Sequence, residues 1–361
     1  MPVTAIKLIN FRNIKQCELN TDAPEVFFVG ENGQGKTNIL ESVYYLCYGT
    51  SFRTREDSIL CKNDESFFSA SASYFKSRED INEIAISWKN RVKNIRLNGK
   101  TITDRKDIIR NQPCIIFCHD DIGFVNGPPE KRRLFLDQTL SLYNPYYIDL
   151  LRKYKKILKT RNHLLRENNT ALLDVYDEQF VELGMEIQKK REEITSLFEP
   201  FFKDKFSEIA KFKELVAIQY QSTWSGMNEK DEILNFIRNK RKYEILNGVS
   251  SSGPHRDKLL FLHRDSDFSQ IGSTGQMRLI SLILRIIQAE FYSRTTGRKP
   301  LLLLDDVLLE LDREKRIRIL ENLPPYEQAF FTFLPNEDYV NYHKENTMVY
   351  EVKSGGFKKR G

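Results

Sequence analysis

A glycine-rich loop near the start of the chain carries the residue types that bind phosphate. It reads Gly30-Glu31-Asn32-Gly33-Gln34-Gly35-Lys36-Thr37 and continues into Asn38. Its glycines let the backbone take positive φ angles and approach an anion, so that successive N–H groups can point at phosphate oxygens. In this pattern Lys36 is expected to reach the β- and γ-phosphates of a nucleotide, and the Thr37 hydroxyl to be a ligand of Mg²⁺. Residues 30–38 are therefore candidate ligands of ATP.

Two elements must position this loop. The apolar run 26–29 precedes it and predicts a buried strand, and the helix that should follow carries Ile39, Val43 and Leu46 on one side. A helix that begins near Lys36 adds its positive N-terminal end to the anion site. A glycine-rich turn that only shapes the chain is the alternative. Because strand, spacing and the Lys-Thr pair agree, phosphate binding is favoured.

A pair of carboxylates far along the chain complements the loop. Four leucines at 301–304 predict a second buried strand, and Asp305 and Asp306 follow it directly. Asp305 is placed to hold the water shell of Mg²⁺, and Asp306 to orient or deprotonate the attacking water. Asp305 is thus a candidate metal ligand beside Thr37, and Asp306 a candidate catalytic residue.

A polar turn stands shortly before this second strand. It reads Ser273-Thr274-Gly275-Gln276 and opens an apolar helix expected from about Met277 to Tyr292. Loop, turn and carboxylate strand in this order indicate an α/β fold, the head of an ABC-type P-loop ATPase. In that class the turn meets the γ-phosphate held by the opposite subunit, so Ser273, Gly275 and Gln276 are expected to bind ATP across a two-fold dimer.

The rest of the N-terminal part has a β pattern. Alternating residues predict strands at 5–9 and 17–19, and an antiparallel β subdomain from about Phe67 to Ile109, where Asn98-Gly99 closes a hairpin. A short buried strand is expected at 114–117. We assign no chemistry to the β subdomain, which serves as a scaffold.

A helical arm is predicted from about Pro145 to Leu246, with a second long helix at 175–198. Its first helix has an apolar face, and a basic face that includes Lys153 and Lys156. A basic face is usually only solvated, and DNA is the competing interpretation. The expected domains are residues 1–140 and 247–361, two lobes of the ATPase head, and 141–246, the arm.

A second basic cluster lies in the first turn of a helix that follows Gly127-Pro128-Pro129. Its members are Lys131, Arg132 and Arg133. Cations oppose the helix dipole at that end, so they need an anionic partner. Two alternatives stay open, namely contact with DNA phosphates and pairing with nearby carboxylates such as Asp137.

Composition excludes several classes of protein. The 361 residues are 40% hydrophobic and 29% charged, which is enough for a sizeable core and too apolar for a disordered chain. No apolar run approaches the roughly 20 residues that cross a bilayer, and no signal sequence is present, so a cytoplasmic protein without a membrane partner is expected. Five cysteines without paired spacing indicate buried small hydrophobes. A net charge of +6 is compatible with a polyanionic partner such as DNA.

Further segments complete a resemblance to the RecF family of recombination mediators over essentially the whole chain. Besides the motifs above they are Asn10-Phe11-Arg12-Asn13, Ser51-Phe52-Arg53, the stretch from Gly127-Pro128 through Arg132-Arg133 to Leu136-Asp137, Arg161-Asn162, and Gly253-Pro254-His255-Arg256-Asp257. The resemblance implies an ABC-type head with a short helical arm, similar to SMC proteins but without their coiled coil. It also implies that Arg12 returns to the nucleotide, whereas the residues alone favour a surface ion pair.

The resemblance carries a function with it. Proteins of this family bind ATP, form ATP-dependent homodimers and bind DNA at gaps or at junctions of single-stranded and duplex DNA. They act with RecO and RecR in loading RecA during DNA repair and replication restart. A weak, DNA-stimulated ATPase that serves as a switch is implied.

The chain departs from the ABC pattern at several positions. Gly272 and Thr274 replace the usual leucine and glycine of the signature turn, and His119 stands where the family tends to have proline. Asp306 is shorter than the usual glutamate, which predicts slow hydrolysis. Thr332 stands where ABC enzymes use a histidine to touch the γ-phosphate, and its hydroxyl can donate one hydrogen bond, so we count it as a catalytic candidate.

We therefore expect an ATP-dependent DNA-binding clamp. Two other classes remain as alternatives, the ATPase of a membrane transporter and a head that powers a partner nuclease. The basic arm and the degenerate signature turn argue against the transporter, and the missing coiled coil argues against the nuclease partner.

Overall fold

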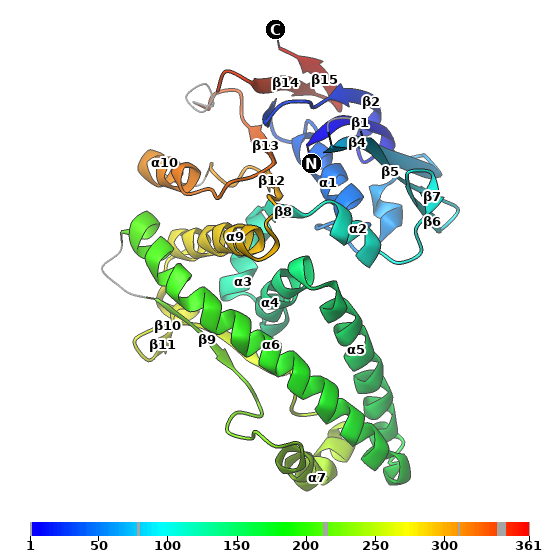
Figure 1. Ribbon diagram of the computed structural model, residues 1–361, viewed down its shortest axis with the longest axis vertical. Helices are drawn as coiled ribbons and strands as arrows, with labels where there is room; N and C mark the ends of the chain where they lie inside the picture. The colour runs from blue at the N-terminus through cyan, green and yellow to red at the C-terminus, as the bar shows by residue number, and fades with distance from the viewer. Residues whose placement is uncertain (1, 78–79, 212–215, 310, 338–343, 361) are drawn as a thin grey trace. The chain divides into compact units, whose positions relative to one another are not determined.

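The computed structural model describes residues 2–77, 80–211, 216–309, 311–337 and 344–360 (Figure 1). It divides into two compact units, residues 1–119 with 288–361 as the first unit and residues 120–287 as the second unit. The predicted boundaries after residues 140 and 246 differ from this division. The reason is that the helix from Pro129 and the strand from Lys258 pack with the helical arm.

The first unit holds most of the strands. These are β1 Val3–Phe11, β2 Ile14–Asn20, β3 Glu25–Val29, β4 Phe67–Ser77, β5 Asp80–Lys89, β6 Val92–Leu97, β7 Lys100–Thr101, β8 Cys114–Phe117, β12 Leu301–Leu304, β13 Gln328–Phe333, β14 Thr347–Lys353 and β15 Gly356–Lys359. Its helices are α1 Lys36–Tyr48, α2 Lys106–Asn111 and α10 Arg313–Glu321, with a 3₁₀ turn at Asp57–Leu60.

A mixed six-stranded sheet forms the centre of the first unit, in the order β15-β14-β3-β13-β12-β8. All pairs are parallel except β14 with β15. Every residue of β3, β8, β12 and β13 is buried, which explains why these strands read as continuous apolar runs. Because parallel strands end at one edge, the loop after β3 and the carboxylates after β12 lie at the same edge of the sheet.

The second sheet of the first unit is antiparallel, in the order β2-β1-β4-β5-β6-β7. It confirms the β subdomain and its hairpin, where Asn98 and Gly99 both have positive φ angles of 50° and 75°. Two features differ from the expectation. The sheet includes β1 and β2, since β1 pairs with β4, and the β pattern ends before α2.

Many apolar side chains of the first unit form a common core. It joins the inner face of the antiparallel sheet to α1, with Ile39, Val43 and Leu46 of α1 buried as predicted. The interpretation of the cysteines as buried hydrophobes holds for Cys47 and Cys114, whereas Cys17, Cys61 and Cys118 are partly exposed.

The second unit is mainly helical. Its elements are α3 Gly123–Asn126, α4 Pro129–Tyr143, α5 Pro145–Arg166, α6 Thr170–Ala210, α7 Lys230–Asn247, α8 Phe268–Ile271, β9 Ala217–Gln221, β10 Lys258–His263 and β11 Ser266–Asp267. A 3₁₀ turn at His119–Ile122 precedes it, and α9 Thr274–Thr296 runs from the second unit into the first.

Two predictions for the helical arm are corrected. The second long helix is 41 residues long and continues through Pro200, because Phe198, Phe202 and Phe206 keep the apolar spacing of one turn and are all buried. The predicted all-helical stretch also contains β9, which pairs with β10. A strand of five residues is too short for its alternation to be recognised in the sequence, and its pairing partner lies far along the chain.

Helix α4 confirms the helix predicted after Gly127-Pro128-Pro129, and α9 is longer at both ends than predicted. Pro129 occupies the first turn of α4, where its missing N–H costs nothing. Helix α9 begins at Thr274, slightly before the predicted residue, and continues beyond Tyr292. Within the described ranges, no helix combines the length and the hydropathy that crossing a bilayer requires.

A buried ionic cluster joins α5, α6 and α7. The Arg161 Nε donates to Asp177 Oδ1 at 2.7 Å, and its Nη2 lies 2.7 Å from Glu244 Oε2. The Nη1 of the same guanidinium donates to Ser250 Oγ at 2.7 Å. All these side chains are buried and have lost their water shells. Each charge is therefore stabilised by its partners in place of water.

We predict that Arg161→Met destabilises the protein by about 3 kcal/mol, because it leaves two buried carboxylates with one cation fewer. Urea denaturation followed by circular dichroism would measure the change. Arg152→Met, which removes an exposed pair with Asp149 on the same helix, is the control and should cost below about 1 kcal/mol. Equal losses for the two variants would contradict the role of the buried cluster.

Candidate functional site

The glycine-rich loop connects β3 to α1 as predicted. Gly33 and Gly35 have positive φ angles of 76° and 120°, which L side chains rarely adopt. A Cβ atom on Gly35 would also lie 3.0 Å from Asn13 Oδ1. Helix α1 begins at Lys36, so its free N–H groups face the loop. The backbone therefore has the form that an anion-binding loop requires.

Lys36 points into the curve of this loop. Its side chain is 3% exposed, and Nζ donates to the carbonyl oxygens of Gly30 at 2.8 Å and Glu31 at 3.2 Å. Asp306 Oδ2 lies 3.7 Å from the same atom. An ammonium group has three protons, so a phosphate oxygen can accept from it without displacing both carbonyls.

Thr37 and Asp305 come together across 268 residues of sequence. The Thr37 hydroxyl donates to Asp305 Oδ1 at 2.9 Å. A hydroxyl beside one carboxylate fits Mg²⁺, which takes few protein oxygens and completes its shell with water and phosphate. Among the described residues no group of three or more His, Cys, Asp or Glu side chains could hold a metal ion.

Burial changes the acidity of this carboxylate. Desolvation raises the pKa of Asp305 to about 6, and the neighbouring charge of Asp306 adds to the rise. The hydrogen bond from Thr37 opposes it. A bound cation would favour the ionised form, so metal binding and deprotonation of Asp305 are linked.

Asp306 and Thr332 hold one another in place. Asp306 has a positive φ of 50°, and its N–H donates to Thr332 Oγ1 at 2.7 Å. The Thr332 hydroxyl in turn donates to Asp306 Oδ1 at 2.8 Å. The same hydroxyl lies 3.3 Å from Asp305 Oδ1, and its predicted contact with the γ-phosphate stays a prediction. Thr332 therefore positions Asp306, and the strained backbone of Asp306 is fixed from two sides.

Arg12 is bound by a carboxylate of α1. Its Nε and Nη2 donate to the two oxygens of Glu41 at 2.9 and 2.7 Å. Glu41 is buried and also accepts from Ser51 Oγ at 2.5 Å and from Arg53 Nη1 at 3.1 Å. Arg12 thus makes an ion pair, as the residues alone favoured, but with a buried carboxylate and not at the surface. A contact between Arg12 and nucleotide stays a prediction.

Asn38 links this cluster to the start of the chain. It accepts from Arg53 Nη1 at 3.0 Å and donates to Asn13 Oδ1 at 2.8 Å. Asn13 Nδ2 donates to the carbonyl of Gln34 at 3.1 Å. The turn between β1 and β2 therefore supports the loop, although the two are distant in sequence.

Sequence reasoning missed Asn13, Glu41 and Glu337 as site residues. Glu337 lies after β13, accepts from the N–H of Leu334 at 2.9 Å, and has a pKa raised by burial, with Asp306 adding to the rise. The sequence shows that Glu41 and Glu337 are acids, one in α1 and one beyond β13. It does not show which groups they contact, because their partners come from other parts of the chain.

The signature turn lies at the N-terminus of α9 in the second unit. The N–H of Ser273 donates to Gln276 Oε1 at 2.8 Å, and the N–H of Gln276 donates to Ser273 Oγ at 3.3 Å. This is a capping box, in which Ser273 is exposed and Gln276 is half-buried. Gly275 has no atom within 4 Å of the position a Cβ would take, so the turn is open to an approaching ligand.

Two members of the second basic cluster, Arg132 and Arg133, have internal partners, which favours the alternative of pairing within the protein over contact with DNA phosphates. Arg133 is 8% exposed and donates to the carbonyl of Asp257 at 2.7 Å. Arg132 donates to Asp267 Oδ2 at 3.1 Å and to Ser269 Oγ at 2.9 Å. Asp137, the partner we expected, binds Arg191 at 2.9 Å instead. Lys131 remains exposed.

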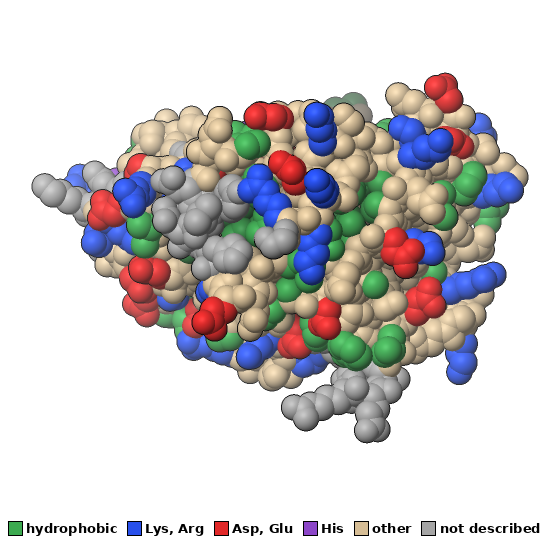
Figure 2. Space-filling view, turned by 90° about the horizontal axis from the view of Figure 1, so that it is seen from above, with side chains coloured by type: hydrophobic (Ala, Val, Ile, Leu, Met, Phe, Trp, Pro, Cys, Tyr) green, Lys and Arg blue, Asp and Glu red, His purple; other side chains and the backbone are tan. Residues whose placement is uncertain are grey.

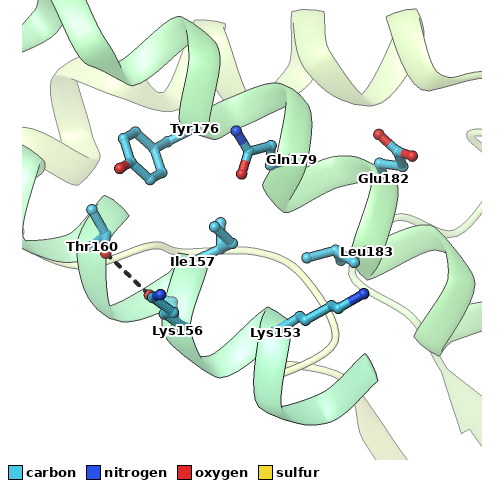
Figure 3. A pocket seen from close by; sticks show the side chains of 8 residues that line it. All are labelled: Lys153, Lys156, Ile157, Thr160, Tyr176, Gln179, Glu182 and Leu183. Atoms are coloured by element: carbon cyan, nitrogen blue, oxygen red, sulfur yellow. Dashed lines mark hydrogen bonds between the residues drawn. The ribbon is translucent and has the colours of Figure 1, made fainter. Parts of the chain in front are cut away.

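Lys153 and Lys156 are exposed on α5, at the rim of a cavity of about 470 Å³ between α5 and α6 (Figure 3). Figure 3 shows the two lysines on one side and Gln179 and Glu182 of α6 on the other. The exposed face agrees with a phosphate contact along α5. Glu182 on the opposite rim would repel a phosphate, so the contact is limited to the α5 side.

Fold and site together define the class of the protein, the head of an ABC-type P-loop ATPase. The parallel strands carry the phosphate loop and the carboxylate pair, and a capped signature turn opens α9. The model of the RecF/RecN/SMC N-terminal domain family matches residues 2–356. The chain belongs to this family and, within it, to the RecF proteins, as the following relatives show.

The DNA replication and repair protein RecF of Treponema pallidum is 44% identical over 347 residues, which is 96% of this chain and 98% of that protein. RecF of Halalkalibacterium halodurans is 31% identical over the full length of both. The solved structure of the recombination mediator protein RecF with ATP, in the RecFOR pathway, is 28% identical and superposes with a TM-score of 0.90 over 100% of this chain and 98% of that one. An Smc head of Pyrococcus furiosus, 16% identical with a TM-score of 0.57 over 100% of this chain and 96% of that one, shares the fold.

We predict that affinity for ATP with Mg²⁺ falls as pH drops through about 6, since Asp305 must be ionised to support the cation and its pKa lies near that value. Titration with a fluorescent ATP analogue between about pH 5 and pH 8 would show the change. Asp305→Asn should bind ATP with Mg²⁺ more weakly, and its affinity should no longer change as pH passes through about 6. A wild-type profile that is flat across this range would contradict the role of Asp305.

We also predict that Thr332→Val lowers the rate of ATP hydrolysis about tenfold or more while ATP affinity stays within about twofold, because Asp306 loses the group that orients it. Steady-state phosphate release and ATP titration would measure the two effects. Thr332→Ser keeps the hydroxyl and should retain the rate. Wild-type turnover in Thr332→Val would show that the hydroxyl does not position Asp306.

Proposed function

We propose that this chain is an ATP-dependent DNA-binding recombination mediator. The observation that carries the proposal is that Lys36 and Thr37 of the loop meet the carboxylate pair at one edge of the parallel sheet, Thr37 at Asp305 and Lys36 near Asp306. Relatives named DNA replication and repair proteins, and a solved relative with ATP in the RecFOR pathway, support it.

Each nucleotide ligand has a distinct role in this proposal. The loop N–H groups and Lys36 bind the phosphates, and Thr37 and Asp305 would hold Mg²⁺, which neutralises charge on the β- and γ-phosphates. Asp306 orients the attacking water. Because an aspartate is shorter than the usual glutamate, hydrolysis is slow and serves as a switch.

Dimerisation depends on the signature turn. Ser273, Gly275 and Gln276 cap the ATP of a second copy in a two-fold dimer. The Ser273 oxygen accepts from Gln276, so its proton is available for a phosphate oxygen. ATP thereby joins two chains, and hydrolysis separates them.

DNA binding uses exposed lysines of the second unit, Lys131, Lys153 and Lys156. Lysines act on phosphates as point charges, so binding should be sensitive to salt and indifferent to base sequence. The preferred DNA is gapped or contains a junction of single-stranded and duplex DNA. The protein acts in the cytoplasm with RecO and RecR in loading RecA.

Sedimentation velocity with a fluorescent gapped duplex, with and without ATP and Mg²⁺, tests this function. ATP should convert monomer to dimer, and the dimer should carry the DNA. Lys36→Met should abolish the association, because the phosphates lose their principal cation.

Ser273→Arg separates the two parts of the proposal. It should leave ATP binding intact and prevent dimers, since the change lies outside the chain's own nucleotide loop. Dimers of Ser273→Arg with ATP would contradict capping between chains. A wild-type protein that stays monomeric and binds DNA regardless of ATP would contradict the function itself.

A further inference from the structure

The C-terminal hairpin of β14 and β15 carries a charged face at the edge of the mixed sheet. In its register Glu351 lies opposite Lys358 and Lys353 opposite Gly356. Because side chains alternate along a strand, Glu351, Lys353, Lys358 and Arg360 share one face. That face has three cations and one acid.

The tip of this hairpin is bonded to the phosphate loop. The N–H of Ser354 donates to Gln34 Oε1 at 2.7 Å, and the N–H of Gly355 donates to the Gln34 carbonyl at 2.8 Å. Gly355 has a φ of 76°, and a Cβ there would lie 2.6 Å from the carbonyl oxygen of Asn13. Gln34, which we expected to contact nucleotide, thus uses its side chain to hold the hairpin.

A second contact joins the same two segments. A Cβ on Gly30 would lie 2.4 Å from the carbonyl oxygen of Val352, so the first residue of the loop packs directly against the backbone of β14. Strands β3 and β14 pair in register up to Val29 with Glu351. The loop and the hairpin therefore cannot move independently.

A cavity of about 530 Å³ lies between them. Glu31 and Gln34 line it from the loop, and Lys353, Lys358 and Arg360 from the hairpin. Arg360 pairs with Glu351 at 3.3 Å, whereas the side chains of Lys353 and Lys358 make no hydrogen bond or ion pair within the described residues. Figure 2 views the molecule from the side of β14 and β15, and it shows Lys and Arg side chains, with Asp and Glu side chains among them, beside hydrophobic ones near the middle of this face.

We propose that this hairpin contacts DNA phosphates and that its bonds to Gln34 couple the contact to nucleotide binding in the loop. The inference rests on the proposed function, since it needs both ATP and DNA as ligands. Exposed lysines suit a contact that does not depend on base sequence. Coupling between two sites is reciprocal, so ATP in the loop strengthens DNA binding at the hairpin, and DNA strengthens ATP binding by the same factor.

Protection of the sheet edge is the competing explanation. Lysines on an edge strand prevent pairing with other chains, and β15 is such a strand. This explanation requires neither the cavity nor the bonds to the loop. It predicts that loss of the lysines leaves DNA binding unchanged.

The first test is the double variant Lys353→Ala with Lys358→Ala, titrated with gapped duplex DNA in ATP and Mg²⁺ over a range of salt. Two lost phosphate contacts should lower the slope of log affinity against log salt by about 1 to 2 and weaken binding about tenfold at low salt. Lys100→Ala with Lys299→Ala removes two exposed lysines elsewhere in the first unit and should match the wild type.

The second test concerns coupling. Gly355→Ala should displace the tip from the loop, so the ratio of DNA affinities with and without ATP should fall towards one. Gly99→Ala is the matched control, because Gly99 has a φ of 75° and no atom within 4 Å of its Cβ position. Thermal melting of both variants would show that each is folded.

The outcomes separate the two proposals. A wild-type protein that does not bind DNA with ATP overturns the proposed function and this inference together. Wild-type binding with no change in the lysine double variant overturns only the inference and leaves edge protection. If ATP raises DNA affinity by the same factor in Gly355→Ala and Gly99→Ala, the coupling between the hairpin and the loop is overturned.

Discussion

The parallel alignment of β3, β13 and β12 is the constraint on which the candidate site depends. It places three strand ends at one edge, so that residues 268 positions apart in sequence, Thr37 and Asp305, share a hydrogen bond of 2.9 Å. Thr332 at the end of the middle strand then reaches Asp306. A shift of one residue in any of these registers would turn the side chains to the wrong face of the sheet.

Buried charge is the second theme of the structure. Glu41 holds Arg12 and Arg53 beside α1, and in the second unit Arg161 and Arg191 are held by carboxylates. Removing such charges from water is costly unless partners replace the water, so these arginines are fixed in place. This explains why several arginines of the family motifs are parts of the scaffold, whereas Lys131, Lys153 and Lys156 are exposed.

The phosphate loop also has more support than its own sequence suggests. Asn13 binds it from the turn between β1 and β2, and the C-terminal hairpin binds Gln34 from the opposite end of the chain. A loop rich in glycine loses much conformational entropy when it is ordered. Contacts from both termini of the chain offset that loss, and they make the loop sensitive to whatever the hairpin contacts.

The sequence by itself determined the fold class, the phosphate loop with its flanking strand and helix, the carboxylate strand and the polar turn at Ser273 that opens a helix. Each of these is encoded in a few consecutive residues, since glycines, apolar runs and capping residues act over one or two turns of chain. Only the tertiary structure decided that Arg132 and Arg133 face inward, that Gln34 holds the hairpin, that β9 is a strand, and that residues 120–287 form one unit. Those features depend on partners brought from distant parts of the chain, and no local pattern records which partner a side chain will meet.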